Sequence, residues 1–326
     1  MILVLGGSSF SGSSYVSHLL SMGEKVVSFE RTELNRRLFS PINPSVINNY
    51  TRISFNLNSS IQEIIDFVND NQIKIVVNFA AQSMVSQSWS NSEDWYEANV
   101  TSLAKLANKL STDTKICKFI QFSTPEVYGS TDGWHKENFD FKPNTPYAIS
   151  RAAGDWHLKA LNENSGFPVI FTRAANVFGE HQQLYRIVPK VVISALTGGK
   201  VPLHGGGKSV RSFIHIADVN HALDLIMSTG MLGESYHIST KELITIQNLV
   251  EKIASKLNVN FENLVEFTAE RPGKDFAYKL DSTKIRMELG WNDEISLDQG
   301  LDRTIAWVTS NLGELRSLPS EYIHRK

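Results

Sequence analysis

Short apolar runs alternate with amphipathic stretches from the first residues of the chain. Residues 2–5 are an unbroken apolar run, which is typical of a strand buried on both faces of a parallel sheet. A glycine turn follows, and residues 13–20 then carry apolar side chains at helical spacing as far as Gly23, where a helix would stop. Strand, glycine turn and helix in this order are the context that a dinucleotide-binding turn requires.

The same alternation continues for about half of the chain. We expect strands at residues 26–29, 53–57, 73–79, 118–123 and 169–172, and helices at 61–68, 94–110 and 146–162. Thr145 and Pro146 are typical of the N-cap and first turn of the last of these helices. Strands that alternate with helices pair in parallel through right-handed crossovers, so the pattern predicts an α/β fold with a doubly wound parallel (Rossmann) sheet.

The pattern changes after Arg173. Glycines cluster at 198–199 and 205–207, the apolar runs become shorter, and helices are expected at 187–196, 219–227, 245–257 and 297–309. We expect a dinucleotide-binding domain at residues 1–174 and a smaller α+β substrate-binding lobe at 175–326. Segments near 213–240 could rejoin the first domain.

Composition and charge narrow the classes of partner. The formal net charge of −2 over 326 residues gives no indication of nucleic acid or of an acidic membrane surface. No apolar stretch is long enough to span a bilayer, and the nine histidines lack metal-ligand spacing, so neither a membrane nor a metal is expected. Cys117 cannot form an internal disulfide and is expected in the core, as are His215 and His237. Because Met1 leads directly into a core strand, we expect no signal peptide and a cytoplasmic location.

The glycine turn is suited to a diphosphate. Gly6, Gly7 and Gly12 remove side chains that would keep an anion away from backbone N–H groups and from the positive end of the helix dipole. The common spacing would also place a glycine at position 9, which is Ser9 here. A tight turn without a ligand therefore stays an alternative.

Glu30 and Arg31 bear on the choice of cofactor. Glu30 lies 18 positions after Gly12, at the end of the second expected strand. A carboxylate there can accept hydrogen bonds from an adenosine ribose, which favours NAD. Arg31 could pair with a 2′-phosphate, so NADP is less favoured but stays open.

Two further segments carry groups suited to acid–base chemistry. The stretch 123–129 follows a buried strand, and Thr124 and Glu126 can face one substrate at the strand's carboxyl end. Tyr147 and Arg151 are four residues apart on one helix and share a face. The cation should lower the pKa of the tyrosine toward the range of a general base on a sugar or alcohol hydroxyl. Alternatively, stretch 123–129 is a turn without a function, and Tyr147 and Arg151 are a pair on the surface of an amphipathic helix.

The order of these motifs resembles the extended short-chain dehydrogenase/reductase family, and within it the nucleotide-sugar 4,6-dehydratases. The glycine turn, Asn99 in a long helix, Ser-Thr-x-Glu-x-Tyr-Gly and Tyr-x-x-x-basic come in the family's sequence. The similarity covers nearly the whole chain and includes stretches 173–179, 210–218, 271–275 and 289–291.

The resemblance implies NAD as cofactor, a nucleotide-diphosphate sugar as substrate, and a homodimer formed by the helices at 94–110 and 146–162. It implies that Tyr147 takes the proton of the sugar C4 hydroxyl while the C4 hydride moves to NAD. Thr124 would hydrogen-bond the C4 oxygen, and Arg151 would hold the nicotinamide ribose. Glu126 would remove the C5 proton before water leaves from C6.

The resemblance also implies two sets of binding residues. The cofactor set is Gly6, Ser9, Phe10, Ser11, Gly12, Glu30, Arg31, Asn56, Leu57, Phe79, Ala80, Ala81, Asn99, Ser123, Tyr147 and Arg151. The substrate set is Ser83, Thr124, Asn176, Arg211 and Arg271.

Two positions depart from the family pattern. Arg151 stands where the family has lysine, and Pro125 stands where the dTDP-glucose branch has an acidic residue. Glu126 must then make both proton transfers, or the reaction differs. A nucleotide-sugar epimerase or decarboxylase is therefore an alternative, and a non-catalytic dinucleotide sensor is a second one.

Overall fold

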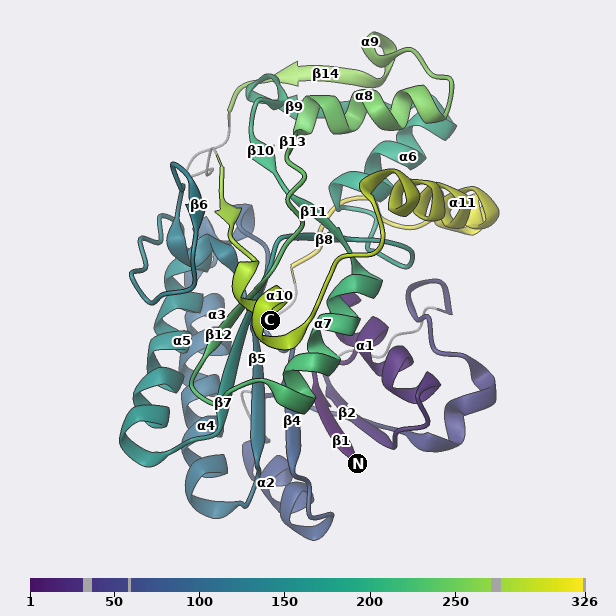
Figure 1. The fold of residues 1–326 in the computed structure, drawn as a ribbon. Helices are drawn as coiled ribbons and strands as arrows, with labels where there is room; N and C mark the ends of the chain where they lie inside the picture. The colour runs from purple at the N-terminus through teal and green to yellow at the C-terminus, as the bar shows by residue number, and fades with distance from the viewer. Residues whose placement is uncertain (32–36, 58–59, 271–276, 325–326) are drawn as a thin grey trace.

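A parallel sheet of seven strands forms the centre of the chain. The computed structural model describes residues 1–31, 37–57, 60–270 and 277–324. The strand order is β12-β7-β5-β4-β1-β2-β3, and every neighbouring pair is parallel (Figure 1). The strands are β1 (Ile2–Leu5), β2 (Val26–Glu30), β3 (Tyr50–Ser54), β4 (Ile75–Asn78), β5 (Lys118–Ser123), β7 (Val169–Ala174) and β12 (Ser235–Ile238). The predicted fold class is confirmed.

Helices cover both faces of this sheet. Ile2 and Val4 of β1 share a core with α1 (Phe10–Ser21) and α7 (Ile216–Thr229). Leu3 and Leu5 point to the opposite face, toward α2 (Ile61–Asp70) and α4 (Leu103–Asp113). A strand buried on both faces needs an unbroken apolar run, which explains the first residues of the chain.

The helix expected at 94–110 is present in three parts. It consists of α3 (Ser92–Tyr96), a π-helical segment (Glu97–Ser102) and α4. The neighbouring helix α5 (Pro146–Ser165) begins as predicted, with the Thr145 side chain accepting from the N–H of Ala148. It packs closely on the π segment: a Cβ at Gly154 would lie 2.5 Å from the Asn99 carbonyl oxygen.

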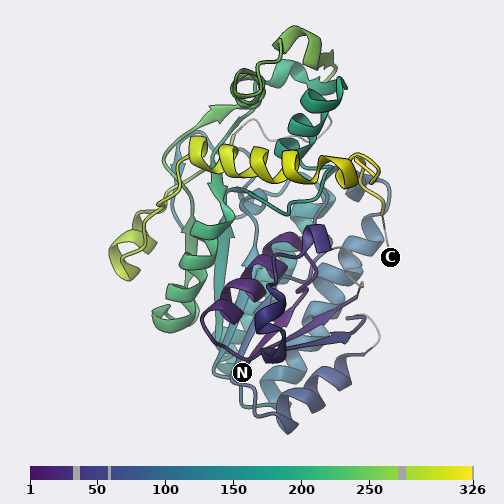
Figure 2. The same cartoon turned by 90° about the vertical axis from the view of Figure 1, so that its right-hand side faces the viewer.

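A second lobe lies beyond the carboxyl ends of the central strands (Figures 1 and 2). Its helices α6 (Ile187–Thr197), α8 (Ile246–Lys256), α9 (Phe261–Leu264) and α11 (Leu297–Leu315) share one apolar core, while α10 (Thr283–Leu289) packs on β12. Its short strands pair as β8 (Asn176–Phe178) with β11 (Phe213–His215), β9 (Val201–His204) with β14 (Val265–Thr268), and β10 (Val210–Arg211) with β13 (Ile244–Thr245). A last pair joins β6 (Trp134–His135) to β15 (Lys279–Leu280).

Two predictions about single segments are wrong. The strand expected at 53–57 lies at 50–54, because β3 is the edge strand beside β2 and carries half-buried and exposed residues without a buried face. Cys117 is exposed instead of buried, since it lies just before β5 begins. His215 and His237 are buried as expected. Within the described ranges no helix is long and apolar enough to cross a membrane.

Candidate active site

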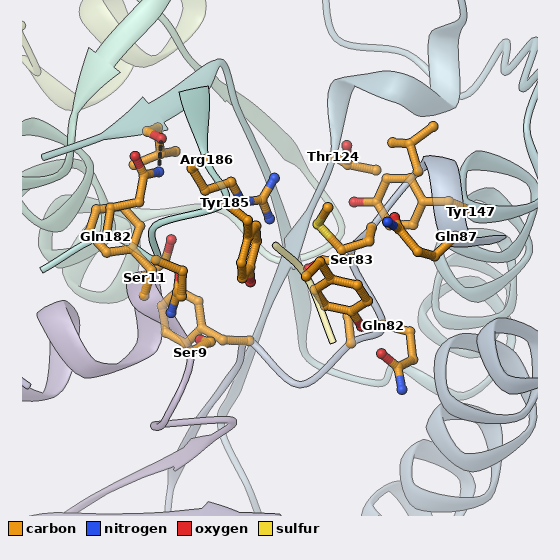
Figure 3. Close-up of a pocket in the computed structure, with 18 of the residues that line it drawn as sticks. Ser9, Ser11, Gln82, Ser83, Gln87, Thr124, Tyr147, Gln182, Tyr185 and Arg186 are labelled. Carbon is orange, nitrogen blue, oxygen red and sulfur yellow. Dashed lines mark hydrogen bonds between the residues drawn. The ribbon is translucent and has the colours of Figure 1, made fainter. Parts of the chain in front are cut away.

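A cavity of about 1750 Å³ lies between the second lobe and the carboxyl ends of the central strands (Figure 3). Most of the residues predicted to act in catalysis or to bind cofactor or substrate line it: Gly6, Ser9, Phe10, Ser11, Glu30, Arg31, Asn56, Leu57, Phe79, Ala80, Ala81, Ser83, Ser123, Thr124, Glu126, Tyr147, Arg151, Asn176 and Arg211. Gly12 and Asn99 are not part of the lining, and Arg271 lies outside the described residues.

Gly6 and Gly12 are required by the packing of the turn that follows β1. Gly6 has a φ of +77°, and a Cβ there would lie 2.7 Å from the backbone nitrogen of Ala80. A Cβ at Gly12 would lie 2.3 Å from the Gly6 carbonyl oxygen, far inside van der Waals contact. Gly12 therefore lets α1 approach β1 closely, and its contribution to a bound anion is indirect.

Ser9, the departure from the common glycine spacing, caps α1. Its hydroxyl accepts from the N–H of Gly12 at 3.1 Å and donates to the Gly6 carbonyl at 2.8 Å. Its φ of −72° needs no glycine. The N–H groups of the first helical turn have no partner within a helix, and Phe10 and Ser11 line the cavity. Ser9 therefore uses the N–H of Gly12, and the N–H groups of Phe10 and Ser11 stay available to an anion.

Glu30 brings a buried carboxylate to the cavity from the end of β2. Its Oε1 lies 2.5 Å from Arg52 Nε, and Oε2 has no hydrogen-bond partner in the described part of the chain. Burial raises the pKa of Glu30 to about 7, although the Arg52 guanidinium opposes the shift. A buried carboxylate oxygen without a partner, such as Glu30 Oε2, can accept a hydrogen bond from a ligand hydroxyl.

Thr124, Glu126, Tyr147 and Arg151 meet on one wall of the cavity. Thr124 caps the 3₁₀ turn Pro125–Tyr128 by accepting from the N–H of Glu126 at 3.3 Å. The Thr124 hydroxyl lies near enough to the Tyr147 phenol to lower its pKa, and the two side chains lie close together in Figure 3. The end of β5 and the start of α5 thus place a hydroxyl, a carboxylate and a phenol around one point.

The prediction that Arg151 lowers the pKa of Tyr147 toward neutrality is wrong for the structure described. Burial and the nearby Glu126 charge raise the pKa of Tyr147 to about 12. Arg151, Thr124 and Arg186 lower it, but they do not outweigh burial. The direction of the arginine's effect was foreseen, and the larger effect of burial was not.

Arg151 is anchored and still has a donor to offer. Its guanidinium donates to the Phe122 carbonyl of β5, and the side chain is buried. Its Nε is buried and has no hydrogen-bond partner among the described residues. An arginine therefore fits at this position and leaves one N–H group unsatisfied.

The side chains of Asn99 and Ser123 are engaged by other residues of the chain. The Asn99 side chain bonds to both the N–H and the carbonyl of Gln82 at 2.9 Å, and also to the Ser150 hydroxyl. It therefore holds the loop after β4 instead of facing a ligand. The Ser123 hydroxyl donates to Asp155 at 2.6 Å, so its side chain is already engaged.

The second lobe supplies the opposite wall. Asn176 accepts from the Tyr278 hydroxyl at 2.7 Å, and the Arg211 guanidinium lies 4.4 Å from the centre of the Tyr278 ring. The position of Tyr278 near the predicted pair Asn176 and Arg211 could not be read from local pattern.

Other lining residues were missed from the sequence: Gln87, Tyr185, Arg186 and Tyr278. The Oε1 atom of Gln87 is buried without a partner in the described ranges, and Figure 3 shows the side chain beside Tyr147. Arg186 lies close enough to act on the Tyr147 pKa. Arg186 directly precedes α6, and this position at the start of an expected helix is the sequence feature that could have pointed to it.

Known proteins share this architecture over nearly the whole chain. A dTDP-glucose 4,6-dehydratase from Streptomyces niveus is 30% identical over 317 residues, covering 95% of this chain and 93% of the relative. The low-salt glycan biosynthesis protein Agl12 of Haloferax volcanii is 31% identical and covers 93% of this chain and 97% of its own.

Among solved structures, the dTDP-glucose 4,6-dehydratase DesIV of Streptomyces venezuelae, with NAD bound, superposes with a TM-score of 0.87 at 29% identity. The match covers 96% of this chain and 98% of DesIV. A dTDP-glucose 4,6-dehydratase of Bacillus anthracis in complex with NAD has a TM-score of 0.86 at 28% identity, with 97% and 98% covered. The family model for GDP-mannose 4,6 dehydratase matches residues 3–304. The chain therefore belongs to the GDP-mannose 4,6-dehydratase family.

Proposed function

We propose that this chain is an NAD-dependent nucleotide-sugar 4,6-dehydratase, a lyase of the extended short-chain dehydrogenase/reductase type. The similarity to 4,6-dehydratases extends over 95% of the chain. The observation that carries the proposal is the meeting of Thr124, Glu126 and Tyr147 on one wall of the cavity. A hydroxyl, a carboxylate and a phenol are the groups that oxidation at C4 and elimination across C5 and C6 require.

The residues present fit NAD. Glu30 Oε2 offers an unused acceptor to the adenosine ribose, the first turn of α1 offers N–H groups to the diphosphate, and Arg151 Nε offers an unused donor to the nicotinamide ribose. The carboxylate of Glu30 also disfavours a 2′-phosphate, which argues against NADP. When bound, NAD accepts a hydride from the sugar C4 and returns it at C6.

The side chains of the wall move the protons. Tyr147 takes the C4 hydroxyl proton, and Thr124 holds the C4 oxygen. Because burial raises the pKa of Tyr147 to about 12, this transfer depends on the groups that stabilise its phenolate, which are Arg151, Thr124 and Arg186.

Glu126 completes the elimination. The new 4-keto group makes the C5 proton acidic, and Glu126 removes it. Pro125 has no acidic group, so the same proton passes from Glu126 to the C6 hydroxyl, which leaves as water. C5 regains a proton from solvent when C6 is reduced, and the product is a 4-keto-6-deoxy sugar nucleotide.

A product assay tests the reaction. Incubation with dTDP-glucose or with GDP-mannose should give a product lighter by one water, which carries one deuterium at C5 when the reaction is run in D₂O. An unchanged mass would indicate an epimerase, and loss of carbon dioxide from a uronic acid substrate would indicate a decarboxylase. No product and no change in cofactor absorbance with any of these sugars would support the sensor alternative.

Variants separate the two halves of the reaction. Glu126→Gln should accumulate NADH, because oxidation at C4 proceeds and elimination stops. Tyr147→Phe should slow both. A Glu126→Gln enzyme that forms product at the wild-type rate would contradict the dehydratase mechanism.

We also propose a cytoplasmic homodimer. Ile149 and Trp156 of α5 and Tyr96 of α3 expose 42%, 49% and 37% of their surface, which is unusual for large apolar side chains on adjacent helices. Pairing these helices with a second copy would bury them. Light scattering should give twice the chain mass, and Trp156→Glu should give the mass of one chain.

A further inference from the structure

Residues 318–324 run from the second lobe back to the dinucleotide-binding domain. They follow α11, which ends at Leu315 in the core of the lobe. Figure 2 shows the yellow chain turning down from the end of α11 toward the blue segments of the other domain. The family model matches residues 3–304, so this segment lies beyond the matched pattern.

Specific contacts hold the segment at both ends. On the lobe side, Glu321 Oε1 lies 2.6 Å from Lys190 Nζ of α6. On the other side, His324 Nε2 lies 2.7 Å from Asp94 Oδ2 of α3. The His324 ring also stacks on Trp95, with centroids 5.0 Å apart and planes inclined by 16°. Both partners of the His324–Asp94 pair are less than one-fifth exposed, so solvent screens this contact only in part.

Between these contacts the segment forms a wall of the active-site cavity. Five of its residues line the cavity together with the glycine turn: Leu318, Pro319, Glu321, Tyr322 and Ile323. The Tyr322 ring meets the Tyr185 ring edge to face at 5.3 Å. Arg31 follows β2 and Arg186 directly precedes α6. Both lie close enough for their charges to lower the pKa of the Tyr322 phenol, which burial raises. The segment therefore lies over the part of the cavity between these two arginines.

We propose that residues 318–324 are part of the ligand site and close the cavity over the bound dinucleotide, with His324 as the positioning residue that acts through Asp94 and Trp95. The inference rests on the proposed function. In that reaction the hydride leaves and returns within one turnover, so the cofactor need not exchange between turnovers. A wall that slows cofactor release is compatible with such a cycle and would not be compatible with a dehydrogenase that exchanges cofactor each turnover.

The dissociation rate of the cofactor tests the proposal. The purified full chain is loaded with NADH, an excess of NAD is added, and the loss of NADH fluorescence is followed. His324→Ala removes the hydrogen bond to Asp94 and the ring contact, and should speed release about tenfold, the factor expected for one partly buried hydrogen bond to a carboxylate combined with one ring stack. His324→Lys keeps a hydrogen-bond donor for Asp94 and should recover most of the difference.

Controls separate this effect from a general loss of structure. Lys256→Gln breaks ion pairs to Asp298 and Asp302 on the surface of α11, away from the cavity, and should leave the rate unchanged. A chain that ends at Leu318 should release NADH at least as fast as His324→Ala. Wild-type release rates in both His324→Ala and the shortened chain, with unfolding midpoints preserved, would overturn this inference alone. A wild-type chain that binds no NADH would overturn the proposed function as well.

Discussion

Glu30 is the residue of the cavity at which burial and ion pairing oppose each other most directly. Its side chain is almost fully buried, one oxygen faces Arg52, and the other has no partner in the described part of the chain. Burial still raises the pKa of Glu30 from 4.5 to about 7. The folded chain therefore holds this proton more tightly than the unfolded chain does, and stability is lost as pH rises through this range.

The magnitude of the loss follows from the two pKa values. At about 1.4 kcal/mol per pH unit, the interval from 4.5 to about 7 corresponds to about 3 kcal/mol, most of which falls between pH 5 and pH 8. Glu30→Gln has no proton to lose. Relative to wild type, the variant should gain about 2 kcal/mol of unfolding free energy over that pH interval.

Chemical denaturation of both chains at pH 5 and pH 8, without added cofactor, measures this difference. Glu24→Gln is the matched control, because Glu24 is exposed just before β2 and should give no pH-dependent difference. A wild-type chain that gains stability over Glu30→Gln as pH rises would refute the reasoning, since the Arg52 ion pair would then outweigh burial. The same variant should bind NAD about tenfold more weakly, because a charged acceptor for a ribose hydroxyl is lost.

Substitutions at three positions further test the site. Gly12→Ala should lower the unfolding free energy by about 2 kcal/mol and weaken NAD binding, because its Cβ would meet the Gly6 carbonyl at 2.3 Å; a denaturation curve and an NAD titration check this. Tyr147→Phe should reduce turnover about 10²- to 10⁴-fold and leave NAD affinity within about threefold, as measured by product formation and titration. Arg151→Lys keeps the cation but loses the fork that bonds the Phe122 carbonyl, so turnover should stay within about tenfold of wild type, whereas Arg151→Met should lose about 100-fold or more.

How well the fold could be predicted depended on burial. Residues 2–5 and 118–123 coincide with β1 and β5, because central strands covered on both faces need continuous apolar runs. The edge strand β3 has one neighbour and exposed residues, so its pattern was weak and its position was predicted three residues late. That β12 joins the sheet beside β7 was open from the sequence, because its partner lies more than 60 residues away.

The site could be predicted where chain order alone brings groups together. The carboxyl ends of parallel strands meet at one edge, so Gly6, Glu30 and Thr124 could be placed together from their positions at or just after the ends of β1, β2 and β5. Tyr185 and Tyr322 reach the same cavity only through the packing of the lobe on the sheet. No local pattern carries that information.

Pro125 and Arg151, the two departures from the family pattern, lie on the same wall of the cavity, and both bear on the pKa of Tyr147. Pro125 leaves Glu126 as the carboxylate of the 3₁₀ turn, and the charge of Glu126 raises the pKa of Tyr147. Arg151 stays charged at every working pH and therefore always opposes this effect. A lysine at the same position could lose its charge if burial lowered its pKa. If the two positions compensate in this way, Glu126→Gln should lower the Tyr147 pKa, and NADH formation by that variant should persist to lower pH than oxidation by the wild type. An oxidation step with the same pH profile in both chains would show that the two positions act independently.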